Sequence, residues 1–228
     1  MTERTRELRR RSLEARPAIS AERALLLTEF YRENEGKYSV PVMRALSFLH
    51  ICRHKTIWIG EGELIVGERG PEPKAVPTYP ELTCHSLEDL RILDSRPLTS
   101  YAVSAECLAA YEETVIPYWR GRSLRDKMFG ELAPEWHEAY AAGIFTEFME
   151  QRAPGHTVLD EKPFRRGLLD FKADIAREIG RLDFVQDGAA WEKREQLRAM
   201  AISCDAAILF AERHAGLQVQ QRELADGE

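Results

Sequence analysis

Apolar residues recur at helical spacing along most of the chain. The pattern is clearest over 191–215, where Leu197, Ala201 and Cys204 are spaced by four and three residues. This spacing places them on one face of a helix with about 3.6 residues per turn. Weaker versions of the pattern are bounded by N-cap residues, prolines or glycines and predict further helices. These cover Thr2–Ala15, Ser20–Glu35, Pro41–Ile51 and Gly167–Leu182, and shorter helices begin after Ser86, Ser104 and Ser123. Another helix is predicted over Trp136–Met149, with a break near Gly143.

One stretch has the chemistry of strands instead. Thr56–Ile59 and Glu63–Gly67 are short β-branched runs on either side of Gly60-Glu61-Gly62. Such runs around a glycine turn predict a β-hairpin. The following segment, Gly70–Pro80, holds four prolines, which exclude a helix and a central strand. The expected fold is a mainly α-helical segment with a small β-hairpin.

Composition places the chain among ordinary globular proteins. Of its 228 residues 44% are hydrophobic and 31% charged, and the net charge is -6. This balance excludes wholesale disorder, and the net acidity argues against a nucleic-acid partner. The uncharged apolar runs at 139–145 and 206–211 are far shorter than the ~20 residues that span a bilayer. We therefore expect no membrane partner, and the Arg- and Glu-rich first residues do not look like a signal peptide.

Cysteine and histidine positions favour neither a disulfide scaffold nor a metal site. The four cysteines lie far apart without a CxxC pair, which is typical of reduced thiols in a cytoplasmic protein. His50 and His54 have a spacing that can chelate a metal, but a site needs three or four ligands, so packed histidines are the expected interpretation. Cys84 and His85 are direct neighbours, which point away from each other and make a poor nucleophile-base pair.

The segment that best suits a binding site is "FTEFMEQRAPGHT", residues 145–157. A predicted helix ends there, and Ala153-Pro154-Gly155 forces an irregular turn that carries His156. Loops held by rigid elements often carry binding residues. The residue types alone leave an alternative equally open, in which Arg152 satisfies the last helix carbonyls and His156 is a surface histidine.

The same segment, together with "GELIVGERG", "VPTYPELTCHSLEDL", "VIPYWRGRS" and "ISCDAAILFAERHA", resembles the N-terminal part of the glycyl radical enzymes, the pyruvate formate-lyase-like family. Within that family the resemblance is greatest to the branch of hydroxyproline and glycerol dehydratases. It implies that residues 1–228 are the N-terminal portion of an incomplete ten-stranded α/β barrel domain. Residues 1–18 would be a solvated helix or arm, and residues 216–228 a polar tail.

The resemblance also implies a radical lyase or dehydratase chemistry that this chain lacks the parts to perform. In the family, a radical-SAM activating enzyme installs a glycyl radical near the C-terminus, and a cysteine in a Gly-Cys loop becomes the thiyl radical that takes hydrogen from the substrate. This sequence contains no Gly-Cys pair and no C-terminal glycine motif. We expect a fragment that is inactive alone and binds no cofactor itself. Its implied partners are a small hydroxylated substrate, the activating enzyme, and the remaining barrel half or a second copy in a homodimer.

Residue by residue, the resemblance assigns three positions to the substrate pocket. His156 would reach the substrate hydroxyl as a donor, Phe148 would line the pocket, and Arg152 matches an arginine that holds sulfonate in the isethionate-cleaving branch. That branch carries glutamine in place of His156, which disfavours sulfonate cleavage here. Two alternatives remain: a non-catalytic helical remnant or subunit that binds a partner, and a formate C-acetyltransferase of the pyruvate formate-lyase type.

Overall fold

The structure, a computed structural model, describes residues 1–145 and 161–226, with side chains up to residue 218. It divides into two compact units. The first unit comprises Met1–Thr28 and Gly62–His156, and the second comprises Glu29–Glu61 and Thr157–Glu228, as far as these ranges are described. No helix in the described part of the chain has the length and apolar character needed to cross a membrane.

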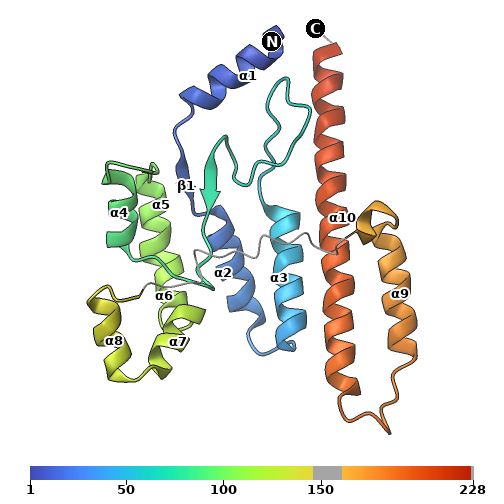
Figure 1. Cartoon of the computed structure of the whole chain (residues 1–228). Helices are drawn as coiled ribbons and strands as arrows, with labels where there is room; N and C mark the ends of the chain where they lie inside the picture. Colours follow the sequence, from blue (N-terminus) through green and yellow to red (C-terminus); the bar gives the residue numbers. More distant parts are fainter. Residues whose placement is uncertain (146–160, 227–228) are drawn as a thin grey trace. The chain divides into compact units, whose positions relative to one another are not determined.

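The first unit is built from short helices and a small sheet (Figure 1). Tyr111, Leu90 and Val115 are fully buried at its centre, where area removed from water supplies most of the stabilisation. Its elements are α1 (Glu3–Glu14), β1 (Ala18–Ser20), the start of α2 (Glu22–Asn34), β2 (Ala75–Pro77), α4 (Leu87–Ser95), α5 (Ala105–Ala110), the π-helical η1 (Tyr111–Val115), α6 (Ile116–Trp119), α7 (Leu124–Glu131) and α8 (Pro134–Ala141).

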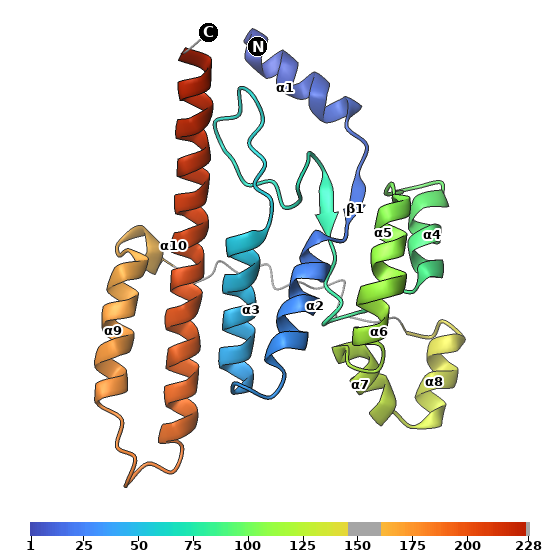
Figure 2. The same ribbon diagram turned by 180° about the vertical axis from the view of Figure 1, so that it is seen from behind.

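The second unit is a layer of long helices. It contains the end of α2, α3 (Val40–His54), the 3-10 helix η2 (Lys162–Phe164), α9 (Leu168–Gly180) and α10 (Ala190–Asp226). Figures 1 and 2 show α10 lying between α3 and α9. Val42 and Ala45 of α3 are buried against Ala199 of α10. Arg213 of α10 also holds the C-terminal end of α3. Its guanidinium donates to the carbonyl oxygens of Cys52 at 2.7 Å and Lys55 at 3.0 Å.

The predicted hairpin is wrong, although a small β element is present elsewhere. Neither Thr56–Ile59 nor Glu63–Gly67 forms a strand, and the side chains of Leu64 and Ile65 are 78% and 93% exposed. A lone hairpin without a covering layer is marginal in water, so β propensity did not suffice there.

The sheet that does form joins β1 and β2 in parallel, with Ala18 opposite Ala75 and Ser20 opposite Pro77. The backbone N–H of Ile19 donates to the carbonyl oxygen of Ala102 at 2.8 Å, on the other side of β1. This agrees with the prediction that the prolines of Gly70–Pro80 exclude a central strand, because β2 lies at the sheet edge, where a missing N–H donor is tolerated.

Helix boundaries follow the capping residues closely. The Ser86 hydroxyl accepts from the backbone N–H of Asp89, and the Asp89 carboxylate accepts from the backbone N–H of Ser86, which makes a complete capping box. Ser104 and Ser123 also cap helices as predicted. Gly143 has φ +72°, a backbone region that disfavours residues with a Cβ, and α8 ends before it. The predicted interruption of the helix near Gly143 is therefore confirmed, and the predicted continuation to Met149 lies outside the described residues after Phe145.

Candidate functional site

The three residues assigned to the substrate pocket, Phe148, Arg152 and His156, lie outside the described residues. The structure therefore neither brings them together nor separates them. It does describe both flanks of their segment: the chain up to Phe145 on the side of the first unit, and the chain from residue 161 on the side of the second.

An aromatic cluster holds the chain where it enters this segment. The ring of Phe145 packs edge-on against Trp136 at 5.5 Å between centroids and lies 5.7 Å from Tyr140. Tyr140 in turn meets Phe129 of α7 in an edge-to-face contact at 4.9 Å. Such contacts stabilise beyond the area they bury. Phe145, the first residue of the candidate segment, is thus packed on α8, which in turn contacts α7.

A cation completes the cluster. The guanidinium of Arg125 lies 4.5 Å from the centroid of the Phe129 ring and 5.7 Å from that of Tyr140. It also donates a long hydrogen bond, 3.4 Å, to the Tyr140 hydroxyl. A guanidinium over an aromatic face is attracted by the ring quadrupole. The sequence analysis did not predict this cluster, although the repeated aromatic residues between 129 and 145 could have indicated it.

The flank in the second unit is held by charges. The Arg166 guanidinium forms an ion pair with Asp174 of α9 at 2.5 Å, and this pairing lowers the pKa of that carboxyl. The Asp170 carboxylate accepts from the backbone N–H of Gly167 at 3.0 Å, at the start of α9. An acidic group at a helix N-terminus is favoured by the helix dipole. Both ends of the candidate segment therefore lead into defined structure.

The histidine pair on α3 packs against an aromatic ring. The rings of His50 and His54 lie 4.5 Å apart, and Phe30 lies 5.4 Å from His50. Burial first, and then the neighbouring His54, lower the pKa of His50. In the described part of the chain, no group of three or more His, Cys, Asp and Glu side chains is arranged to hold a metal ion.

Cys84 has the properties of a packed thiol. Burial raises its pKa to about 11, and the thiol contacts the carbonyl oxygen of His85 at 3.9 Å. A thiol with so high a pKa carries little thiolate near neutral pH and is a poor nucleophile. The adjacency of Cys84 and His85 therefore creates no catalytic dyad of the kind considered above.

Sequence reasoning also missed a buried polar pair in the first unit. The Tyr111 hydroxyl and the Thr78 hydroxyl are both buried, and within the described residues neither makes a hydrogen bond of ordinary geometry. Burial raises the pKa of Tyr111 well above its usual value. Tyr111 begins the π-helical turn η1, an irregularity that periodicity alone does not reveal.

Comparisons with known proteins identify the relatives of this chain. Residues 1–227 match the model of the pyruvate formate lyase-like family. Trans-4-hydroxy-L-proline dehydratase of Clostridioides difficile is 48% identical over 221 residues, which cover 97% of this chain and 28% of that protein. Isethionate sulfite-lyase of Desulfovibrio desulfuricans is 30% identical over 223 residues, covering 93% of this chain and 26% of that protein.

A solved structure shares the fold as well. The crystal structure of the hydroxyproline dehydratase from Clostridioides difficile, with trans-4-hydroxy-L-proline bound, matches 100% of this chain and 28% of its own chain, with a TM-score of 0.91 and 46% sequence identity. The similarity falls on the N-terminal region of such enzymes. The chain thus spans little more than a quarter of the length of these relatives. On the match over residues 1–227, the chain belongs to the pyruvate formate lyase-like family, whose members among its relatives are dehydratases and lyases.

Proposed function

We propose that this chain is the N-terminal segment of a glycyl radical dehydratase that acts on a small hydroxylated substrate. The single observation that carries the proposal is its 48% identity, over 97% of its length, to trans-4-hydroxy-L-proline dehydratase. The sulfite-lyase is 30% identical, so dehydration is the reaction better supported. A cyclic hydroxylated amino acid is the first substrate class to test.

The contribution of this chain to the reaction is substrate recognition and proton donation. In the proposed role, His156 donates a hydrogen bond, or a proton, to the hydroxyl oxygen that leaves as water. An imidazole with an ordinary pKa of ~6.5 has both protonation states available near neutrality, which suits a general acid. Phe148 would supply an apolar wall, and Arg152 a cationic group for an anionic part of the substrate.

The radical chemistry itself belongs to a part of the enzyme that this chain does not contain. The radical supplies the hydrogen abstraction from substrate, and the sequence has neither the Gly-Cys pair nor the glycine motif that would carry it. The chain by itself is therefore proposed to be inactive. Its proposed partners are the radical-SAM activating enzyme and the complementary part of the barrel.

A chimera tests the proposal directly. Residues 1–227 of this chain are fused to the part of the Clostridioides difficile dehydratase that follows the matched region, and the product is activated by that dehydratase's activating enzyme. We expect a glycyl radical signal in electron spin resonance and dehydration of trans-4-hydroxy-L-proline. The chain alone, treated identically, is the matched control and should show neither.

Two results would count against the proposal. A chimera that carries the radical but does not dehydrate any cyclic or linear hydroxylated amino acid would reject the substrate class. Turnover or a glycyl radical in the chain alone would reject its role as an incomplete segment.

A further inference from the structure

The second unit has an apolar groove formed by α3, α9 and α10. It encloses about 960 Å³. Three large apolar side chains on its surface are widely exposed: Val40 at 73%, Phe48 at 44% and Met200 at 51%. Contiguous apolar surface of this kind usually marks a contact with another protein part, because exposure to water is unfavourable.

Three small side chains run along the α10 part of the groove. Ala199, Ser203 and Ala207 follow one another at steps of four residues, so they lie along one face of α10. Figures 1 and 2 show α3 and α9 on either side of that helix. Small residues allow the backbone of another helix to come close, at the short end of the ~8–10 Å found between helix axes.

Three of the charged groups that line the groove, Arg166, Asp174 and Glu178, are paired within the unit. Arg166 pairs with Asp174 at 2.5 Å, and Glu178 accepts from the guanidinium of Arg181 at 2.7 Å. An apolar centre with a charged rim is the usual anatomy of a protein interface. The buried side-chain atoms without a partner, in the described part of the chain, belong to residues that do not line the groove. Among the described residues, the groove therefore holds no buried, unpartnered polar atom that would orient a small molecule.

The relatives supply a candidate occupant. The chain covers 28% of the Clostridioides difficile dehydratase, so most of that enzyme has no counterpart here and must pack against this segment somewhere. An amphipathic helix from that complementary part would bury its apolar face on Met200 and Phe48, and it would complete a four-helix arrangement with α3, α9 and α10.

We propose that the groove between α3, α9 and α10 is the docking surface for an amphipathic helix of the complementary part of the enzyme. The inference rests on the proposed function, because it assumes such a complementary part, and it deepens that function by assigning the surface that receives it.

Cys204 is a native probe of the groove, since it lines the groove and is partly exposed. The rate at which iodoacetamide alkylates Cys204 is measured by peptide mass spectrometry, in the chain alone and in the chimera described above. Burial and the nearby Asp205 raise the pKa of this thiol, so both rates are measured at one mildly alkaline pH. We expect the chimera to react at least ~10-fold more slowly, because the reagent must wait for local opening.

A second experiment places a charge in the groove. Met200→Glu introduces a carboxylate at a side chain that is half exposed in the isolated chain. The melting temperature of the isolated chain should therefore shift by less than ~3 °C. In the chimera the same carboxylate would be buried without a partner, and Cys204 should regain the alkylation rate of the isolated chain. Glu212→Lys, an exposed site on α10 outside the groove, is the control and should change neither rate.

The outcomes separate the two proposals. Protection of Cys204 without dehydration supports the docking surface and rejects the proposed substrate class. Turnover in a chimera whose Cys204 reacts as fast as in the isolated chain rejects the docking surface alone. Slow alkylation of Cys204 in the isolated chain overturns the proposal. If the rate is slow at every protein concentration, the groove is closed in the isolated chain. If the rate is slow only at high protein concentration, the occupant of the groove is a second copy of this chain. If the chimera is insoluble, these isolated-chain rates still decide whether the groove is open.

Discussion

The indole N–H of Trp119 donates a hydrogen bond to the hydroxyl oxygen of Thr28 at 2.9 Å, between α6 and α2. Thr28 is fully buried and Trp119 is 4% exposed. The Thr28 hydroxyl itself donates to the carbonyl oxygen of Ala24 at 2.6 Å, so it serves as acceptor and donor at once. The bond joins residues that are distant in sequence and fixes how these helices of the first unit pack.

Replacing Thr28 with valine should destabilise the first unit. The substitution keeps the shape but removes the acceptor of the Trp119 bond, and leaving a buried donor poorly satisfied costs about 1–3 kcal/mol. Thr28→Ser, which keeps the hydroxyl, is the control and should lose less. Urea unfolding followed by tryptophan fluorescence measures both; equal stability of Thr28→Val and the parent chain would contradict the account.

Arg23 should not be replaceable by lysine. Its guanidinium donates to both carboxylate oxygens of Glu81 and to the carbonyl oxygen of Thr78, and it lies 4.0 Å from the Tyr79 ring. An ammonium cannot reproduce this fork and stack, so Arg23→Lys should lower the free energy of unfolding by about 1–3 kcal/mol. Arg16→Lys, at an exposed pair with Asp94, should cost about 0–1 kcal/mol in the same urea experiment. Similar losses at the two sites would be inconsistent with this view.

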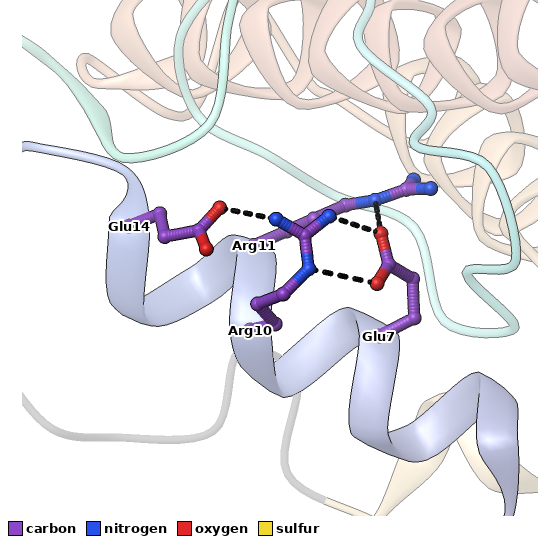
Figure 3. A network of polar contacts seen from close by, with 4 residues as sticks. All are labelled: Glu7, Arg10, Arg11 and Glu14. Carbon is purple, nitrogen blue, oxygen red and sulfur yellow. Dashed lines mark hydrogen bonds and ion pairs between the residues drawn. The ribbon is translucent and has the colours of Figure 1, made fainter.

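The network on α1 predicts an unusual carboxyl titration (Figure 3). Hydrogen bonds from Arg10 at 2.6 and 2.9 Å and from Arg11 at 2.7 Å lower the pKa of Glu7 to about 2. Because the folded pKa lies below the usual 4.5, any stabilisation from this network is present above pH 4.5 and is lost as pH falls toward 2.

The network lies on the surface, where its side chains are open to solvent, so salt should screen it. Carbon NMR of the Glu7 carboxyl should give a midpoint well below 4.5 at low ionic strength, moving toward 4.5 in concentrated salt. A midpoint near 4.5 at low salt would show that the network does not persist in solution.

Cys84 should ionise only at high pH. Its pKa of about 11, raised by burial from an ordinary value near 9, means that folding favours the neutral thiol. The corresponding stabilisation is therefore complete below pH 9 and is lost as pH rises through 11. The alkylation rate of Cys84 should accordingly keep rising beyond pH 9. A rate that levels off near neutral pH would instead reveal an activated thiolate.

The helices of this protein were predictable because their signals are local. The serines at positions 86, 104 and 123 cap helices where the sequence placed them, and the period of Leu197, Ala201 and Cys204 falls within α10. These features need only neighbouring residues, so a single sequence contains them.

The β element was not predictable in the same way. β1 pairs with a strand more than fifty residues away, and the partner contains Pro77, which argues against a strand locally. The β-branched run Thr56–Ile59 had the right composition but forms no strand. Strand formation depends on such long-range partners, which propensity does not encode. The aromatic cluster around Phe145 likewise depends on tertiary packing, and the assignment of His156 rests on resemblance alone.

The most direct test of the account is the replacement of His156 with alanine in the chimera, with radical content and turnover measured on the same sample. Because His156 is proposed to donate to the departing hydroxyl, and not to support the radical, the glycyl radical signal should be retained while turnover falls by ~10²–10⁴. His156→Gln, which keeps a donor but no transferable proton, should lie between alanine and histidine. A full radical signal with undiminished turnover in His156→Ala would contradict the central claim that this chain supplies the proton donor of a dehydratase.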